Sequence, residues 1–442
     1  MTFPGPLPGI LPDSAAVTLD GHLSVAGCDL VAVAEQFGTP VYVYDEAAIR
    51  QRSRDFREAL RDRYRGESLV CYAAKAYCAP WLLRVLAEEG LGLDVVSGGE
   101  LFVARASGFP AERIYVHGNN KSEDELRLAV EMGVRRVVVD NMDEVARLGR
   151  IAGALGREQT VLLRVTPGVE AHTHEYIKTG TLDSKFGVSI ANGAAEAAVR
   201  AIVRQPGLRL VGLHSHIGSQ IFELEPYRET LRRLLRFAGP LWRELGLTLR
   251  EISPGGGFGM RYTADDDPVP AARIVETLAN AATEAATEEG FADPLPAITI
   301  EPGRSIVGPA GVAVYRVGSV KEIPGVRTYV AVDGGMADNI RPTTYGAVYS
   351  ALLANRAGEA PTGTFAIAGK YCESGDVLIR AAHLPAPRVG DLVAVPGSGA
   401  YNLAMASNYN LALRPPVVVV KDGQARLARR RETYEDLVRA EL

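Results

Sequence analysis

The sequence lacks the features that would place the chain in a membrane, outside the cell or on a nucleic acid. It has no run of about 18 apolar residues, so we expect no membrane-spanning helix. Its four cysteines show neither a CxxC spacing nor a paired framework, which fits a reduced, cytoplasmic setting. The formal net charge is -5 and the only basic run, at 429–431, is short, so we expect no nucleic-acid partner.

The first dozen residues also lack something, namely the basic and apolar regions of a signal peptide. They carry four prolines instead, at positions 4, 6, 8 and 12, and we expect a loose tail. The remaining composition is ordinary, with 442 residues, 47% hydrophobic and 23% charged. This length allows two domains, one of which can be a barrel.

From residue 68 onward, short apolar runs alternate with amphipathic helical segments. One of these helices is expected to begin at Ser122, with Glu125 completing a capping box. Eight strands alternating with helices predict a closed parallel (β/α)8 barrel. A doubly wound open sheet is the alternative, but it usually carries a glycine-rich fingerprint after its first strand, and none is present here. The expected strands are 68–73, 92–96, 113–117, 136–140, 160–165, 210–215, 249–253 and 297–300.

The pattern changes after Arg304, where short β-like runs are broken by glycine and proline. This change predicts an all-β C-terminal domain, which the strands before residue 46 are expected to join. The expected domains are therefore an N-terminal segment at 1–45, the barrel at 46–305 and the β domain at 306–442.

Chemistry in such barrels gathers at the C-terminal ends of the strands. Each of the eight expected ends carries a polar, titratable or glycine-rich residue. We therefore expect an active site there. In chain order the ends provide Lys75, Ser97 to Glu100, His117, Asp140, Arg164, His214, the glycines at 255–257 and Glu301.

Lys75 is either a surface charge or an amine that forms a Schiff base, most commonly with pyridoxal phosphate. The glycines at 255–257 allow backbone amides to approach a phosphate, and Ser219 could add a hydroxyl. Glu301 could hold a protonated pyridine nitrogen or pair with Arg304. His214 could stack on a ring or be an ordinary buried histidine. The histidine pairs at 172/174 and 214/216 have no third ligand at suitable spacing, so we expect no metal.

Several motifs carry a resemblance to a known family. They are YAAKA at 72–76, GLHSHIGSQ at 212–220 and EPGR at 301–304, followed by NIRP at 339–342, YGA at 345–347, CESGD at 372–376 and GAY at 399–401. With these motifs the chain resembles the fold-type III pyridoxal-phosphate decarboxylases, and among them the diaminopimelate decarboxylases. The flank at 369–371, which reads GKY, departs from the proline and apolar residue that many relatives have there.

The resemblance implies an alanine-racemase-like barrel with a β domain and pyridoxal 5'-phosphate as cofactor. Lys75 would hold the cofactor covalently, His214 would stack on its ring and Glu301 would bind its pyridine nitrogen. The remaining cofactor-binding residues implied in this way are Ser219, Gly256, Gly257, Gly303, Arg304 and Tyr401.

The resemblance also implies a substrate and an assembly. The reaction would convert meso-2,6-diaminopimelate to L-lysine and carbon dioxide, the last step of lysine biosynthesis. Cys372 would donate the proton, and both it and Glu373 would reach into the site of the partner subunit, so we expect a homodimer with shared active sites. The residues implied to bind substrate are Arg304, Arg341, Tyr345, Glu373 and Tyr401.

Three alternatives stay open. The chain could decarboxylate another amino acid, of the ornithine, arginine or lysine type. It could be an amino-acid racemase on the same barrel, although such racemases tend to place arginine rather than glutamate at the pyridine nitrogen. It could also be a silent cofactor-binding protein, against which Lys75, Glu301 and Cys372 argue. The long loop at 168–187, with His172 and His174, is expected to be a lid.

Overall fold

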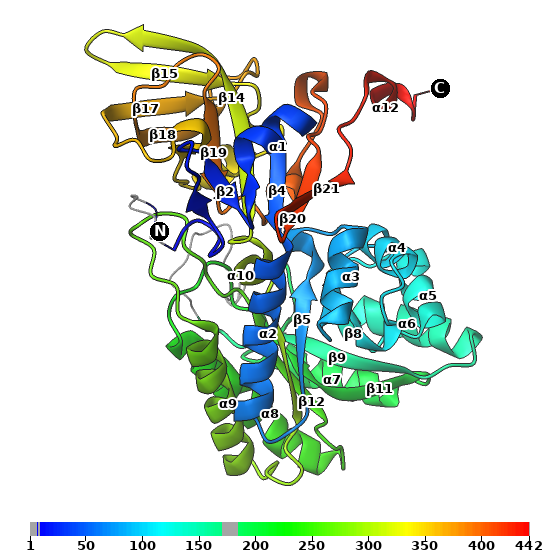
Figure 1. The fold of residues 1–442 in the computed structure, drawn as a ribbon. Coiled ribbons are helices and arrows are strands. Elements are labelled where there is room, and N and C mark those ends of the chain that lie inside the picture. The colour runs from blue at the N-terminus through cyan, green and yellow to red at the C-terminus, as the bar shows by residue number, and fades with distance from the viewer. Residues whose placement is uncertain (1–6, 8, 170–183, 442) are drawn as a thin grey trace. The chain divides into compact units, whose positions relative to one another are not determined.

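The computed structural model describes residues 7, 9–169 and 184–441, and the chain forms two compact units (Figure 1). The barrel unit comprises Arg52–Gly259 and Pro268–Gly303. The β unit comprises the chain up to Gln51, the segment Met260–Asp267 and the chain from Arg304 onward. The predicted fold class, a closed (β/α)8 barrel with a β-rich domain that includes N-terminal strands, is confirmed. The domain boundaries given above stay a prediction.

Eight parallel strands close the barrel, because β13 pairs back with β5 and β8 pairs with β9. Their inward-facing and outward-facing residues are both mostly buried, which explains why the strands are rich in valine, isoleucine and leucine. The strands are β5 (Ser68–Ala73), β6 (Gly92–Val95), β7 (Ile114–Val116), β8 (Arg136–Val139), β9 (Gln159–Thr166), β11 (Leu208–His214), β12 (Glu251–Gly256) and β13 (Ala297–Glu301).

Helices alternate with the strands, and side-chain caps fix the starts of three of them, α4, α5 and α6. Ser97 and Asn141 each accept a backbone hydrogen bond at the start of a helix, and the predicted capping box of Ser122 and Glu125 is present. These caps fix the loops that follow the strands. The helices are α2 (Glu46–Arg63), α3 (Pro80–Glu88), α4 (Gly98–Ala106), α5 (Glu123–Met132), α6 (Met142–Ala154), α7 (Ala194–Arg204), α8 (Glu225–Glu244) and α9 (Ala271–Glu288), with short elements η1 (Ala74–Ala76), η2 (Ala111–Arg113) and β10 (Val188–Ser189).

The β unit is organised around one long strand, β14 (Gly311–Ile323), which pairs with β15 (Arg327–Val332), β19 (Leu392–Pro396) and β4 (Val41–Asp45). A hydrophobic cluster of β2, β4, β14, β20 and α1 side chains forms its core. The remaining elements are β1 (Ala16–Val17), β2 (Leu23–Val25), β3 (Cys28–Asp29), α1 (Leu30–Phe37), α10 (Arg304–Val307), α11 (Arg341–Tyr345), β16 (Leu352–Leu353), η4 (Ala354–Arg356), β17 (Gly363–Ala368), β18 (Val377–Leu384), η5 (Leu403–Met405), η6 (Tyr409–Leu411), β20 (Val417–Lys421), β21 (Gln424–Arg429) and α12 (Tyr434–Val438).

Two further expectations concern a membrane-spanning helix and the predicted lid. Among the described residues, no helix is both long and apolar enough to cross a membrane. The predicted lid at 168–187, with His172 and His174, falls largely outside the described residues.

Candidate functional site

Lys75 lies in the short turn η1, directly after β5. The hydroxyl of Tyr72 donates a hydrogen bond of 2.9 Å to the carbonyl of Tyr77, which brackets the turn. Gly303 packs against the same turn, since a Cβ at this position would lie 3.0 Å from the Cβ of Ala73. Lys75 is exposed, although Ala73 and the other two residues of the turn are buried. The backbone of the turn is therefore fixed, and the amine of Lys75 is exposed on it.

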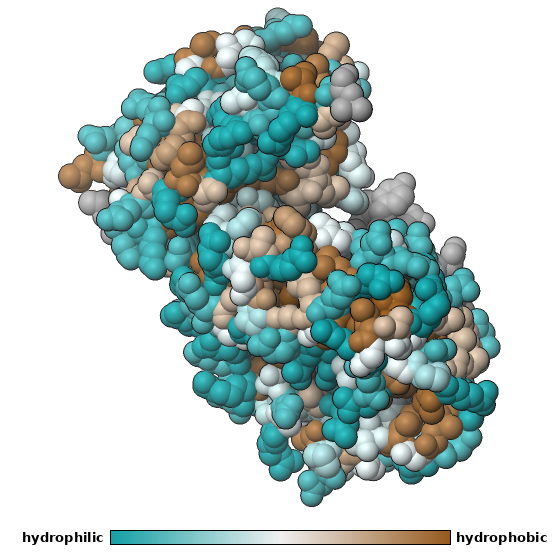
Figure 2. Space-filling view, turned by 90° about the vertical axis from the view of Figure 1, so that its right-hand side faces the viewer, coloured by the Kyte–Doolittle hydropathy of each residue, from teal (hydrophilic) through white to brown (hydrophobic). Residues whose placement is uncertain are grey.

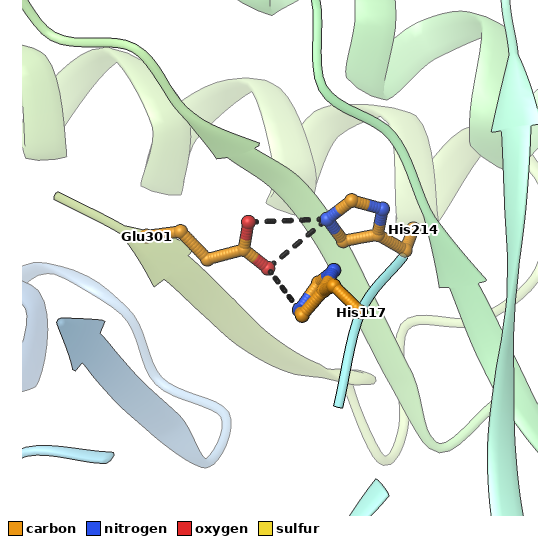
Figure 3. Close-up of side chains that lie close together, drawn as sticks. All are labelled: His117, His214 and Glu301. Carbon is orange, nitrogen blue, oxygen red and sulfur yellow. Dashed lines mark hydrogen bonds and ion pairs between the residues drawn. The ribbon is translucent and has the colours of Figure 1, made fainter. Parts of the chain in front are cut away.

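Glu301, at the end of β13, meets two histidines from the ends of two other strands, β7 and β11 (Figure 3). Nε2 of His214 lies 3.0 Å from one carboxylate oxygen of Glu301 and 3.1 Å from the other. Nε2 of His117 lies 3.6 Å from the carboxylate, and the two imidazole rings meet edge to face at 4.8 Å. Burial raises the pKa of Glu301, but the two histidines lower it more, so the net pKa is below the ordinary value. Glu301 is thus held as a carboxylate.

Asp94, at β6, is a second buried carboxyl group beside the same histidine, with its oxygen 3.5 Å from Nε2 of His117. Burial raises its pKa well above the ordinary value, the charge of Glu301 raises it further, and Lys75 lowers it. Burial also holds the pKa of His117 well below its ordinary value. Within one cluster the pKa of Glu301 is therefore lowered while that of Asp94 is raised.

Several polar atoms of this cluster form no hydrogen bond with the residues that the structure describes. They are Nδ1 of His214, Oγ of Ser215, Nε2 of His117 and Oδ1 of Asp94, all fully buried. Buried polar groups are normally hydrogen-bonded, and unsatisfied ones gather where a ligand binds. Ser253 supports Glu301 from the neighbouring strand, with its hydroxyl 3.3 Å from the carboxylate. These features fit a polar heteroaromatic cofactor with a ring nitrogen.

The glycine run ends β12 and lies against the loop that contains Ser219. A Cβ on Gly257, which has a φ of +96°, would lie 2.1 Å from the carbonyl oxygen of Gly218. Ile221 donates a backbone hydrogen bond of 3.0 Å to Gly257, so the two loops run side by side. Only glycine permits this approach, which leaves a compact backbone cradle of the kind that phosphate requires.

Gly256 is held equally closely, since a Cβ there would lie 1.9 Å from the carbonyl oxygen of Glu301. Its amide donates a 3.2 Å hydrogen bond to Nδ1 of His216. Burial holds the pKa of His216 well below its ordinary value, and the charge of Lys75 lowers it further. His216 is therefore a neutral acceptor that fixes the glycine loop.

The loop after His117 is fixed by an ion pair that the sequence patterns do not reveal. Nζ of Lys121 lies 2.8 Å from the carboxylate of Glu144, and both side chains are buried. The same ammonium donates to the carbonyl groups of Gly118 and Val138, at 2.7 and 2.8 Å. One buried lysine thus ties the end of β7 to β8 and α6.

The ligand atoms of His117, His214 and Glu301 all lie within 4.8 Å of one another, a spacing that a metal ion could also use. This trio differs from the histidine pairs considered in the sequence, because His117 takes the place of His216. The same three side chains belong to the cluster that fits a cofactor, so a metal ion and a cofactor would compete for them.

Within the β unit, two buried arginines share a cluster of tyrosines. Arg304 donates a 2.6 Å hydrogen bond to the hydroxyl of Tyr262, and its guanidinium lies 4.7 Å from the ring centre of Tyr401. Tyr401 has a φ of +66°, which is rare for an aromatic residue and typical of constrained functional positions. The guanidinium of Arg341 lies 5.0 Å from the ring centre of Tyr262.

Tyr349 also orients Arg341, because Arg341 donates a hydrogen bond to the Tyr349 hydroxyl. That hydroxyl in turn donates a hydrogen bond of 3.0 Å to Oδ1 of Asn402. Burial raises the pKa of Tyr349 to about 12, although Arg341 opposes this rise. No carboxylate pairs with Arg341 among the described residues. A buried guanidinium without an internal anion is suited to bind an external carboxylate.

Cys372 and Glu373 are exposed in the loop after β17. Buried Asp376 holds this loop, because its carboxylate accepts backbone hydrogen bonds from Met336 at 2.7 Å and Tyr371 at 2.9 Å. The hydroxyl of Thr343 donates 3.1 Å to the carbonyl of Gly375. The Cys372 loop therefore lies next to α11, the helix that carries Arg341 and Tyr345.

The structure thus gathers the predicted residues into two groups. Lys75, His214, Ser219, the glycines and Glu301 lie in the barrel unit, and the other predicted site residues lie in the β unit. Several further participants were not predicted as site residues. Two of them had a sequence signal, His117 at a strand end and His216 in the motif at 212–220. The others are Asp94, Lys121, Ser253, Tyr262 and Tyr349.

Comparisons with known proteins agree with this geometry. The family described as "Pyridoxal-dependent decarboxylase, pyridoxal binding domain" matches residues 46–308. A diaminopimelate decarboxylase of Bacillus subtilis is 50% identical, covering 96% of this chain and 95% of its own length. A diaminopimelate decarboxylase of Synechocystis is 45% identical, covering 99% of this chain and 93% of its own.

Solved structures give the same result. Diaminopimelate decarboxylase of M. jannaschii has a TM-score of 0.90 at 33% identity, covering 98% of both chains. The Helicobacter pylori enzyme in complex with L-lysine has a TM-score of 0.84 at 31% identity, covering 93% of this chain and 99% of its own. The chain therefore belongs to the pyridoxal-dependent decarboxylases, and within them to the diaminopimelate decarboxylase family.

Proposed function

We propose that this chain decarboxylates meso-2,6-diaminopimelate to L-lysine and carbon dioxide, with pyridoxal 5'-phosphate as its cofactor. The observation that carries this proposal is the buried pair of Glu301 and His214, which lies at the same barrel end as Lys75 and the glycine cradle. The near full-length similarity to enzymes of this name supports the choice of substrate.

The barrel unit supplies the cofactor-binding residues. Nζ of Lys75 is the covalent attachment point, and the exposed amine on a fixed turn supports this role. The carboxylate of Glu301 accepts a hydrogen bond from a protonated ring nitrogen and keeps the proton there. Pyridoxal phosphate, when bound, takes up the electrons that the breaking carbon–carboxylate bond releases.

His214 and the glycine loop complete this half of the site. His214 holds the Glu301 carboxylate in place through Nε2, and its ring would stack on the cofactor ring. Ser219, Gly256, Gly257 and the residues around Arg304, Gly303 included, would hold the phosphate, and Tyr401 would contact the cofactor. The close backbone contacts of the glycines support this assignment, because a side chain at Gly256 or Gly257 would collide with neighbouring backbone and push the loops apart.

The β unit supplies the side chains that are proposed to bind the substrate. Diaminopimelate carries two amino-acid heads, and the distal head must be recognised with both charges present. Arg341 is suited to bind its carboxylate through two parallel hydrogen bonds, and Glu373 to accept a hydrogen bond from its ammonium. Arg304, Tyr345 and Tyr401 are the other proposed substrate ligands.

The thiol of Cys372 donates the proton that replaces the lost carboxylate on the same carbon. Its exposure, and that of Glu373, supports action in the site of a second copy of the chain. Exposed Val96, Phe102 and Met142 in the barrel unit also favour a homodimer, and Figure 2 shows hydrophobic patches on an otherwise largely hydrophilic surface. Four free cysteines support a cytoplasmic location.

A spectroscopic experiment tests the cofactor assignment. The purified protein with pyridoxal phosphate should show a visible absorbance band that sodium borohydride abolishes, as expected for a cofactor bound covalently through a lysine. Lys75→Ala should lack this band and lose carbon dioxide release. Full activity in Lys75→Ala would overturn the assignment of this lysine.

A further inference from the structure

A cavity of about 750 Å³ opens at the N-terminal end of the barrel strands. Residues just before or at the start of β5, β8, β12 and β13 line it. This volume lies within the range of small-molecule sites, roughly 300–1,000 Å³. Its charged lining consists of Arg65, Arg135, Arg136, Arg250, Glu67 and Asp293, so positive charge is in excess.

The cavity lies at the other end of the strands from the cofactor cluster. Glu251 is the first residue of β12, whereas Gly256 is its last. On β7, Tyr115 precedes His117 by two residues, and both point into the barrel interior, where successive layers of side chains stack. The cavity is therefore separate from the site described above.

Two of its arginines are held in place by the barrel interior. Nε of Arg136 donates 2.8 Å to the fully buried carboxylate of Glu251. Nε of Arg135 donates a hydrogen bond of 3.0 Å to the hydroxyl of Tyr115, and this hydroxyl donates a hydrogen bond to the carboxylate of Glu251. Thr299 donates 2.8 Å to the same carboxylate. The carboxylate of Glu251 thus accepts hydrogen bonds from three side chains. The terminal nitrogens of Arg135, in contrast, form no hydrogen bond with any described residue.

The other two arginines have no such structural role. The side chains of Arg65 and Arg250 are exposed, and neither forms a hydrogen bond or ion pair with the residues that the structure describes. The N-terminal face of this barrel type usually serves stability rather than chemistry. Stability explains why Arg136 faces buried Glu251, but it does not explain two further unpaired arginines around the same cavity.

We propose that this cavity binds a small multivalent oxyanion, a phosphate ester or polycarboxylate, through Arg65, Arg135 and Arg250. Guanidinium groups match carboxylate and phosphate oxygens in a bidentate geometry. Arg135 is pre-oriented by Tyr115, so it provides a fixed donor, while Arg65 and Arg250 close on the ligand from the rim. The binding is electrostatic and weakens as salt rises.

Titration calorimetry on the cofactor-loaded enzyme tests this proposal, because the loaded phosphate cradle cannot take up the probe. Inorganic phosphate, pyrophosphate and citrate are titrated at one ionic strength into wild type and Arg65→Gln/Arg250→Gln. The matched control is Arg84→Gln/Arg273→Gln, which removes the same charge from exposed positions on α3 and α9. Thermal melting of both variants verifies that they fold.

We expect saturable binding of pyrophosphate or citrate to wild type and control, with at least tenfold weaker binding to Arg65→Gln/Arg250→Gln. A preference for pyrophosphate would identify a phosphate ester as the natural ligand, and a preference for citrate a polycarboxylate. Equal affinity in the two double variants would overturn the proposal, as would the absence of saturable binding of all three anions to wild type.

Discussion

At the scale of single residues, the cofactor cluster shifts the pKa values of two buried carboxyl groups in opposite directions. The pKa of Glu301 is lowered because two histidines outweigh the effect of burial, whereas burial and the charge of Glu301 raise the pKa of Asp94 against the opposing charge of Lys75. A single anion at this position is what a protonated ring nitrogen requires. The charge of Glu301 is therefore the feature on which the proposed electron withdrawal depends.

Glu301→Gln tests that role directly. The amide keeps the size of the side chain but cannot balance a proton on the ring nitrogen, so we expect turnover to fall on the order of 100-fold, about 2.7 kcal/mol of barrier. Steady-state kinetics on cofactor-saturated enzyme measures the change. Asp94→Asn is the matched control, and its effect should be much smaller, because the raised pKa of Asp94 favours its neutral form. Similar losses in both variants would contradict the assignment.

Asp338 gives a second test at this scale, through the pH dependence of stability. Burial raises its pKa to about 6, although Tyr315, the amide of Gly335 and Tyr42 oppose the rise by hydrogen bonding. The unfolded value is about 3.9, so the folded state binds the proton more tightly and stability falls as pH rises from about 4 to about 6.

Asp338→Asn removes this dependence. Urea unfolding measures the unfolding free energy of wild type and variant at pH 4 and at pH 7. When the pH rises from 4 to 7, the difference between the two proteins should shift by up to about 3 kcal/mol in favour of the variant. Hydrogen bonds lost in the variant cancel in this comparison, because they are lost at both pH values. A constant difference would show that Asp338 titrates normally.

At the scale of elements, β12 shows how tertiary pairing overrides local preference. The sequence predicts a strand that stops at residue 253, before the glycines, because glycine is a poor strand former. The structure extends β12 to Gly256, which pairs with Glu301 of β13 after a register shift between Ile252 and Gly255. Similarly, Arg164 was expected at the end of its strand, but β9 continues to Thr166 and Arg164 lies inside it.

Local patterns were sufficient to predict the barrel and to place Lys75, Glu301 and the glycine loop at its strand ends, because each strand and its end are contiguous in sequence. They could not reveal contacts between distant segments. Tyr262 joins Arg304 from 42 positions away, and Lys121 joins Glu144 from 23 positions away. The long β14 likewise pairs with strands from both ends of the chain, which no local pattern records.

The pair of Lys121 and Glu144 provides a test at the element scale. Lys121→Met leaves a buried carboxylate without a partner, so we expect a loss of about 3–5 kcal/mol in unfolding free energy. Lys121→Met/Glu144→Leu removes both charges and should recover most of this loss. Urea unfolding measures all three proteins. A double variant as unstable as the single one would show that the ammonium acts through the carbonyl groups of Gly118 and Val138 instead.

At the scale of the whole molecule, the proposed homodimer divides each active site between two chains. Lys75→Ala and Cys372→Ala should each be nearly inactive as homodimers. Mixing them under conditions that exchange subunits should restore about a quarter of wild-type activity, because half of the dimers are mixed and each has one intact site. Carbon dioxide release measures the recovery. No recovery in dimers that have exchanged would contradict the shared site.

The most direct test of the proposed function is a carbon dioxide assay across a panel of amino acids, run on the cofactor-loaded wild type. We predict rapid release from meso-diaminopimelate and at least 100-fold lower kcat/KM for L-ornithine, L-arginine and L-lysine, which lack the distal carboxylate that Arg341 is proposed to bind. Arg341→Gln should reduce this preference. Comparable release from L-ornithine in the wild-type enzyme would contradict the account.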